Sequence, residues 1–312
     1  MRRGATAAPD QCYVLDMPHP PLGADERETR MAVADKQDRR ELFEKLARAG
    51  FAARAVTYGL IGGLALMAAF GSGGGTTGQS GALQALADNT LGQIVLFLVG
   101  IGLFGYGLWR LTAAGLDLEN EGTDKEGIAT RLAHAGSGLF HFGLSVYAFM
   151  ILFGSAGGSS GGGDGAQSAT ATLMSAPLGI FLVGLLGVGF VAAAGAQVKK
   201  AVKEEYRQHM RVPEHRGWVN PTIKFGILAR AVVFAIIGVF LVVAAVQADP
   251  SEARGVGGAL SWLQQQAWGG ILLGLIGLGL IAFAFYSALQ ARYRFIPDPE
   301  GEARSRLAGA TS

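Results

Sequence analysis

Apolar residues run through this chain in six long segments, and polar residues gather in the tails and connections between them. A helix needs about 20 mostly apolar residues to cross the hydrocarbon core of a bilayer. The pattern therefore predicts six transmembrane helices. They cover approximately residues 52–70, 91–112, 136–154, 177–197, 226–247 and 268–289.

The composition argues against an ordinary soluble domain. Of the 312 residues, 50% are hydrophobic, 16% are charged and 48 are glycine. A soluble protein of this size needs more charge to cover its surface. A single cysteine, Cys12, excludes a disulfide within the chain, and the sequence contains no Cys/His spacing typical of a metal site.

The positions of lysine and arginine predict the orientation. Of the 26 basic residues, 25 lie in the tails, in the connections at 113–135 and 198–225, or at the helix ends facing them. Arg254 is the exception. Because short cytoplasmic connections are enriched in lysine and arginine, both termini are expected to face the cytoplasm.

The chain contains three copies of one unit. The first and last thirds align with almost no gaps; "ARAV" at 53–56 recurs at 229–232, which makes Arg54 and Arg230 equivalent. The middle third is more divergent, with "SGLFHF" at 137–142 in the position of "RAVTYG". Each copy predicts a hairpin of two helices with a glycine-rich outer loop.

A glycine pattern, G-x₇-G-x-G, recurs in the second predicted helix of every copy. Small residues let helix backbones approach closely in lipid, where leucine offers no advantage over a lipid tail. We interpret these glycines as helix-packing positions; a hinge or a backbone-lined pore is the alternative. They are Gly92, Gly100 and Gly102, then Gly179, Gly187 and Gly189, and finally Gly269, Gly277 and Gly279.

The predicted fold class is all-α: a polytopic membrane protein with six transmembrane helices in three parallel two-helix repeats. Two crossings return the chain to its starting side, so the repeats share one topology and are related by a pseudo-threefold axis along the membrane normal. The middle glycines of the three patterns should then lie at one membrane depth. We expect large apolar side chains to fill the axis, Phe104, Phe190 and Ile281 among them.

The order of three motifs carries a family resemblance. "LARAGFAARAVTYGLIG" is followed by "GALQALADNTLG" and then by "GIGLFGYGLWRL". In this order the chain resembles an uncharacterised bacterial membrane-protein family, defined as a domain of unknown function, over about residues 45–296. The resemblance implies three two-helix copies in a bacterial inner membrane, and it implies no activity. The middle copy departs from the pattern, with Ser137 where the others have arginine.

The connections carry weaker local signals. Short helices are expected at about 81–87 and 259–265, and "TDKE" at 123–126 is typical of a capping box that opens a helix. Asn220 and Pro221 suit the N-cap and first position of the fifth long helix. The predicted organisation is a disordered cytoplasmic tail at 1–34, an amphipathic interfacial helix at 35–51, repeats at 52–117, 123–210 (with a charged helical extension) and 220–296, and a disordered cytoplasmic tail at 297–312.

Three polar residues within or near the predicted spans are candidates for function. An ionisable residue inside a membrane is a functional-site hypothesis by default, and His141 is the clearest case; the alternative is a neutral histidine hydrogen-bonded to a neighbouring helix. Arg54 and Arg230 are expected to snorkel to the headgroups or to bind a helix C-terminus or an anionic lipid.

These observations favour a non-enzymatic structural or accessory membrane component. No catalytic, cofactor or metal residues are predicted, because the sequence offers no carboxylate pair, Ser-His-Asp set or metal cluster. A small channel or transporter along the threefold axis is the alternative. Expected partners are membrane lipids with anionic headgroups on the cytoplasmic side and an unidentified membrane protein; nucleic acid is not expected.

Overall fold

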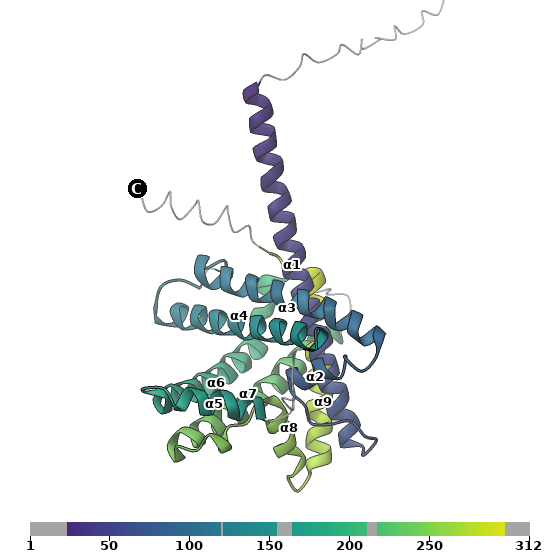
Figure 1. Cartoon of the computed structure of the whole chain (residues 1–312), viewed down its shortest axis with the longest axis vertical. Helices are drawn as coiled ribbons and strands as arrows, with labels where there is room; N and C mark the ends of the chain where they lie inside the picture. The colour runs from purple at the N-terminus through teal and green to yellow at the C-terminus, as the bar shows by residue number, and fades with distance from the viewer. Residues whose placement is uncertain (1–23, 120, 155–163, 211–216, 297–312) are drawn as a thin grey trace, which may run out of the picture. The chain divides into compact units, whose positions relative to one another are not determined.

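The computed structural model describes residues 24–119, 121–154, 164–210 and 217–296, and it divides into two compact units. The first unit, up to Arg39, contributes the beginning of helix α1; the second, from Arg40, contains all the other elements (Figure 1). The tails expected at 1–34 and 297–312 lie mostly outside the described residues. In the described part of the N-terminal tail, helix α1 already begins at Ala24. The sequence predicts that the first helix begins at residue 35.

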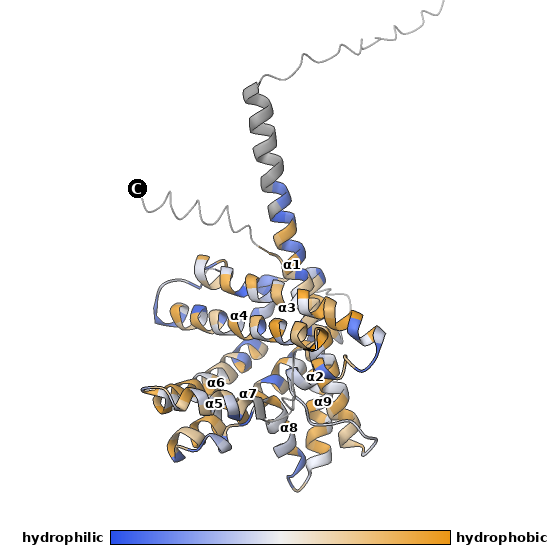
Figure 2. Cartoon of the chain, viewed as in Figure 1, coloured by the Kyte–Doolittle hydropathy of each residue, from blue (hydrophilic) through white to orange (hydrophobic). Residues whose placement is uncertain are grey.

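Six helices in the described chain are long and apolar enough to cross a membrane, which confirms the predicted multi-pass, all-α fold. Figure 2 shows hydrophobic residues along most of their length, with hydrophilic residues in the part of α1 that follows its grey beginning and in the α3–α4 connection. They are α1 (Ala24–Ala69), α3 (Thr90–Leu116), α4 (Lys125–Leu152), α6 (Gly179–Val202), α7 (Val219–Gln247) and α9 (Gly269–Tyr293). Repeat 1 contains α1 and α3, repeat 2 contains α4 and α6, and repeat 3 contains α7 and α9.

A short helix precedes the second long helix of each repeat. The two that the sequence predicts are present as α2 (Gln79–Gln84) and α8 (Val256–Gln264). The third, α5 (Asp164–Met174), was not predicted, because the sequence indicates only a glycine-rich outer loop in this part of repeat 2. Two 3-10 helices, η1 (Glu205–His209) and η2 (Pro250–Glu252), complete the described elements.

Two local predictions were wrong, and a third was right in part. Helix α4 is capped by Asp124, whose side chain accepts a hydrogen bond from the Gly127 amide, so the cap lies one residue after Thr123. Helix α7 begins at Val219, and the Asn220 side chain bonds to residues near the end of α6. The predicted charged extension is helical in two pieces: α6 ends at Val202, and the 3-10 helix η1 covers Glu205–His209.

The first glycine of each pattern lies at the start of its helix, close to the end of the preceding short helix. A Cβ added to Gly92 would lie 2.0 Å from the carbonyl oxygen of Leu86, and one added to Gly269 would lie 1.8 Å from that of Gln264. In repeat 2 the corresponding distance at Gly179 is 1.8 Å. These glycines thus permit a tight turn into the helix, a different contact from the helix–helix packing that the pattern predicts.

The middle glycine of each pattern lies at a contact between repeats. Gly277 on α9 faces Gly62 on α1: a Cβ added at Gly62 would lie 2.7 Å from the Gly277 carbonyl oxygen. Gly187 on α6 faces Gly238 on α7 in the same way: a Cβ added at Gly187 would lie 2.9 Å from the Gly238 carbonyl oxygen. We call these contacts seams: the second helix of one repeat packs on the first helix of the next.

The third seam, between α3 and α4, uses a hydroxyl group instead of a second glycine. Ser145, which is repeat-equivalent to Gly62 and Gly238, donates a hydrogen bond to the carbonyl oxygen of Gly100 over 2.8 Å. Helices α3 and α4 run side by side in Figure 1, as α6 and α7 do. The three seams therefore join repeat 1 to repeat 2 (α3 with α4), repeat 2 to repeat 3 (α6 with α7) and repeat 3 to repeat 1 (α9 with α1).

Aromatic pairs occupy the same three seams. Aromatic rings in tilted or edge-to-face arrangements, with centroids about 4.5–7 Å apart, stabilise a protein beyond the burial of their surface. The first-helix members of these pairs are the residues that the repeat alignment makes equivalent. The pairs are Tyr58 with Phe283, His141 with Tyr106 and Phe234 with Phe190, with ring centroids 4.8, 4.5 and 5.3 Å apart.

The side chains predicted to fill a central axis lie elsewhere. Phe104 is 43% exposed and Ile281 is 38% exposed. Phe104 packs on Phe142 across the α3–α4 seam, and Ile281 approaches Gly62 across the α9–α1 seam. The prediction was wrong because one apolar period cannot distinguish a side chain at a seam from one at the centre.

The last glycine of each pattern faces the first helix of its own repeat, in two cases of three. A Cβ added to Gly102 would lie 2.6 Å from the Ala53 Cβ, and one added to Gly279 would lie 2.1 Å from the Ala229 Cβ. At Gly189 in repeat 2, an added Cβ would meet none of the described residues within 4 Å. Repeats 1 and 3 are thus tightly packed hairpins, and repeat 2 differs from them.

Adjacent glycines on α1 provide a matched test of the seam. We predict that Gly62→Ala lowers the free energy of unfolding by about 1–3 kcal/mol, because the new methyl group overlaps the α9 backbone. Gly63→Ala is the control: its Cβ would meet none of the described residues within 4 Å, so it should be neutral or stabilising by up to about 1 kcal/mol. Thermal unfolding in detergent measures both, and equal effects would contradict the close seam.

Candidate functional site

Arg54 is buried inside the protein. Its side chain on α1 is only 6% exposed, and its guanidinium donates a hydrogen bond to the Tyr106 hydroxyl. The guanidinium carbon lies 5.1 Å from the centre of the Tyr106 ring and 4.9 Å from that of Phe283. The sequence predicted a snorkelling side chain; here a phenol oxygen and aromatic faces take the place of headgroups and water.

Arg230, the repeat equivalent of Arg54, is bound in the same manner. On α7, its Nε donates a hydrogen bond to the Tyr58 hydroxyl over 3.0 Å. Its guanidinium carbon lies 4.2 Å from the centre of the Phe234 ring and 4.9 Å from that of Phe283. Both arginines therefore share the ring of Phe283. Desolvated cation–π contacts of this kind contribute up to about 2 kcal/mol each.

The two arginines connect the helices of their own repeats. Tyr106 on α3 and Phe283 on α9 are repeat-equivalent, so Arg54 with Tyr106 and Arg230 with Phe283 form one contact made twice. We call it the arginine tie. Repeat 2 has Ser137 and Ala193 at these two positions and therefore has no arginine tie.

A hydrogen-bonded chain leads from Arg54 to the end of α3. The Tyr106 hydroxyl also accepts a hydrogen bond from Arg110 Nε over 2.9 Å. Arg110 Nη1 lies 3.4 Å from Glu119 Oε1, and Arg294 Nη2 lies 2.5 Å from the same oxygen. One phenol oxygen thus serves two guanidinium groups, and one carboxylate oxygen serves two more donors.

Glu119 is the counterion at the end of this chain. Its burial alone would raise its pKa, but Arg294 and Arg110 outweigh this effect and hold the pKa well below its usual range. His134 Nε2 lies 3.9 Å from Glu119 Oε2. Glu119, Glu121 and His134 offer potential metal-ligand atoms within 4.8 Å of one another. Two guanidinium groups already neutralise Glu119, so its position favours a structural ion pair over cation binding.

His141 is buried in the α3–α4 seam, 7% exposed, with its ring against Tyr106. Its Nδ1 lies 2.7 Å from the carbonyl oxygen of Ser137, which is on the same helix. The predicted hydrogen bond to a neighbouring helix is therefore replaced by one within α4. His141 and His134 lie on one helix, as the sequence requires, and they belong to different contacts.

Three further basic residues, which the sequence did not single out, stabilise the ends of the seams. The side chain of Arg48 donates to backbone carbonyls at the end of α9, and that of Arg131 to those at the end of α3, over 2.9 and 2.8 Å. Lys224 lies 2.7 Å from Glu204, just after α6, and its hydrogen bond lowers the pKa of Glu204. These three residues are repeat-equivalent. Cations favour helix C-termini, where the carbonyl dipoles point outward.

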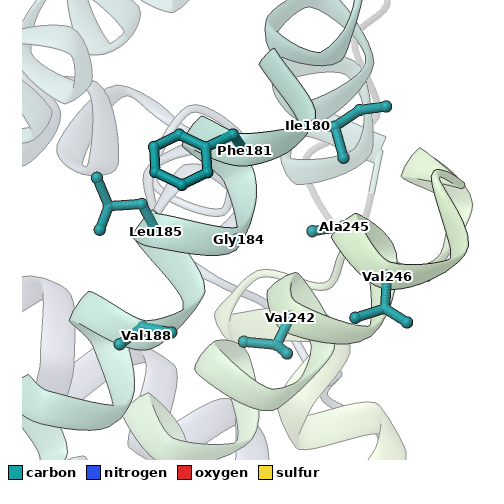
Figure 3. A pocket seen from close by; sticks show the side chains of 8 residues that line it. All are labelled: Ile180, Phe181, Gly184, Leu185, Val188, Val242, Ala245 and Val246. Carbon is teal, nitrogen blue, oxygen red and sulfur yellow. The ribbon is translucent and has the colours of Figure 1, made fainter. Parts of the chain in front are cut away.

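The described surface also contains an apolar groove between α6 and α7, of about 400 Å³. Figure 3 shows Phe181 and Leu185 on one side and Val242 and Val246 on the other, with Gly184 between them. No side chain in this lining can hydrogen-bond or carry charge. The groove therefore cannot recognise a polar ligand. The candidate site remains the arginine centre, by which we mean the contacts of Arg54 and Arg230 and the chain from Tyr106 through Arg110 to Glu119 and Arg294.

The sequence identified the two arginines but not their partners. Tyr106, Phe283, Arg110 and Glu119 were missed, although the repeat offset makes Tyr106 and Phe283 equivalent. Comparing aromatic residues at equivalent positions could have suggested these two. The link from Arg110 to Glu119 and Arg294 depends on how the ends of α3 and α9 meet, for which the sequence gives no signal.

Comparisons with known proteins agree with the repeat structure. The family described as Domain of Unknown Function (DUF1206) matches residues 49–117, 132–204 and 225–294, one match for each repeat. A relative in Bacillus subtilis (strain 168), Uncharacterized protein YxxB, is 32% identical over 274 residues, which is 85% of this chain and 98% of the relative. No solved structure matches the chain.

The double role of the Tyr106 hydroxyl leads to a testable ranking of three tyrosine variants. Tyr106→Phe leaves buried donors of Arg54 and Arg110 without their acceptor, so it should lower the free energy of unfolding by about 2–5 kcal/mol. Tyr58→Phe removes the acceptor of one donor of Arg230 and should lower it by about 1–3 kcal/mol. Tyr286→Phe is the control, because its buried hydroxyl has no hydrogen-bond partner among the described residues. A loss at Tyr286 as large as at Tyr106, measured by thermal unfolding, would contradict this network.

Proposed function

Since the chain belongs to the family described as Domain of Unknown Function (DUF1206), we propose that it is a non-enzymatic structural or accessory component of the bacterial inner membrane. The observation that carries this proposal is the use of its polar interior. The hydroxyls and carboxylate of the arginine centre already accept hydrogen bonds or ion pairs from the protein's own guanidinium groups. These groups hold helices together, which is the behaviour of a scaffold.

The chemistry of this centre supports a role without catalysis. A general base or nucleophile needs an available lone pair or a proton to exchange, close to a space that a substrate can occupy. His141 Nδ1 is engaged with its own helix, and Glu119 lies between two arginines. The apolar groove between α6 and α7 contains neither residue.

One observation favours transport of an anion as a second candidate function. Arg54 and Arg230 carry positive charge inside an apolar region, and intramembrane cations commonly mark ion pathways. In addition, Arg54 Nε is buried without a hydrogen-bond acceptor among the described residues. Against this candidate, both guanidinium groups are enclosed by aromatic rings that would have to move before an anion could bind.

The orientation is part of the proposal. The 25-to-1 distribution of basic residues supports termini on the cytoplasmic side. Arg48, Arg131 and Lys224 stabilise helix ends on that same side, in agreement with this orientation. Anionic lipid headgroups are the proposed lipid partners there, because additional lysines such as Lys199 are exposed.

Flux measurements separate the two candidate functions. We expect the purified protein in liposomes to release chloride or phosphate no faster than empty vesicles. Arg230→Gln should lower the melting temperature, because it removes the contacts to Tyr58 and Phe234, without changing this baseline. Anion flux in the wild type that Arg230→Gln abolishes at an unchanged melting temperature would overturn the structural role in favour of transport.

The orientation is tested by labelling single cysteines in intact cells, after Cys12 has been replaced by serine. Ser72→Cys and Ser251→Cys lie at exposed positions in the proposed outer connections and should react with a membrane-impermeant thiol reagent. Thr123→Cys, equally exposed but in a proposed cytoplasmic connection, should react only after the cells are lysed. Labelling of Thr123→Cys before lysis, with the other two protected, would reverse the topology.

A further inference from the structure

Repeat 2 is an open hairpin. In repeats 1 and 3 the first helix contacts the second through buried small residues, Gly50 and Ala53 on α1 and Gly226 and Ala229 on α7. The equivalent positions on α4, Ala133 and Gly136, are exposed. On α6 the equivalents of Gly102, Gly105 and Trp109 are also exposed: Gly189, Ala192 and Ala196.

The sequence of repeat 2 explains why its two helices are not joined. The arginine tie is absent, because Ser137 and Ala193 replace the guanidinium and the aromatic ring. The small residues that allow close helix approach are nevertheless present on both faces. An added Cβ at Gly136 or at Gly189 would meet none of the described residues within 4 Å. Neither of these two faces thus has a partner among the described residues.

The extent of burial agrees with this reading. In the most apolar part of each long helix, α4 is 28% buried and α6 is 22% buried, whereas α7 is 39% buried and α3 is 50% buried. The least buried spans are thus the two that carry the unpaired faces. Helices in lipid associate through small residues that allow close van der Waals contact, and these faces have that composition.

We propose that the open hairpin of repeat 2 is completed by a second copy of this chain. In a twofold dimer, the Gly136 face of α4 packs on the Gly189 face of α6 in the partner, and the reciprocal contact forms at the same time. The occupant follows from the molecule itself. In repeats 1 and 3 the equivalent faces pack directly on each other, at Ala53 with Gly102 and at Ala229 with Gly279.

The seams argue against closure of the hairpin within one chain. Helix α4 is attached to α3 by the Ser145 hydrogen bond and by Arg131, whereas α6 is attached to α7 through Gly187 and, just beyond its end, through Lys224 and Glu204. A contact between α4 and α6 within one chain would require these two attached pairs to move relative to each other. A second copy reaches both faces without such a change.

Disulfide trapping between differently tagged chains tests this contact. In a Cys12→Ser background, Gly136→Cys with one tag and Gly189→Cys with another are co-expressed, and the membranes are oxidised before solubilisation. Because both positions have open space, the substitutions should leave each chain folded. We expect a linked species of twice 32.4 kDa that carries both tags. Val146→Cys, also exposed on α4, replaces Gly136→Cys in the control and should give at least tenfold less product.

Three outcomes would overturn the proposal. An equal yield from the Val146→Cys control would indicate random collision. A disulfide within one chain, formed when Gly136→Cys and Gly189→Cys are combined, would indicate closure of the hairpin. Reactive thiols without any disulfide would leave the faces to lipid or to another protein. Independently, Gly189→Leu should shift the protein from the dimer to the monomer by light scattering in mild detergent, at an unchanged melting temperature of the monomer.

Discussion

A guanidinium group in an apolar interior must find hydrogen-bond acceptors and a polarisable surface within the protein, because the membrane supplies neither. Arg54 and Arg230 find acceptors in Tyr106 and Tyr58 and share the ring of Phe283, although Arg54 Nε has no acceptor among the described residues. Those partners come from the second helix of the same repeat and from the neighbouring repeat. Satisfying the two charges therefore fixes how α1, α3, α7 and α9 pack. Repeat 2 has no such charge. Its first helix, α4, packs on α3, and its second helix, α6, packs on α7.

The seams show how one packing geometry tolerates different chemistry. At equivalent positions, two seams bring glycine against glycine, and the third uses the hydroxyl of Ser145 on the backbone of Gly100. At their ends, arginine, arginine and lysine each face the C-terminus of the preceding repeat. What the three share is a small residue where backbones meet and a cation near the end of the preceding repeat, which binds backbone carbonyls in two cases and the Glu204 carboxylate in the third. These are the two requirements for an antiparallel helix contact in a membrane, and they allow the rest of each repeat to diverge.

The sequence predicted most of the fold and little of the site. Hydrophobic length and the repeated glycines sufficed for six helices in three units, because both signals are local or periodic. The role of Arg54 was misread, since a basic residue near a helix end looks the same in sequence whether it snorkels or turns inward; its direction depends on Tyr106, which is distant along the chain. Helix α5 and the cap of α4 were missed because glycine-rich stretches and adjacent Thr and Asp residues allow more than one local structure.

The distribution of charge between the repeats bears on what the protein can do. The chain of contacts from Arg54 through Tyr106 and Arg110 to Glu119 lies in repeat 1 and ends at Arg294 of repeat 3. The small-residue faces of repeat 2, at Ala133 and Gly136 on α4 and at Gly189, Ala192 and Ala196 on α6, carry no charge. A pathway for ions would need its charged groups on an open side, whereas here the charges lie in the closed hairpins. The charged contacts are thus enclosed in repeats 1 and 3, and the neutral small-residue faces are exposed on repeat 2. This separation is consistent with the proposed structural role, in which the protein associates with another chain in the membrane.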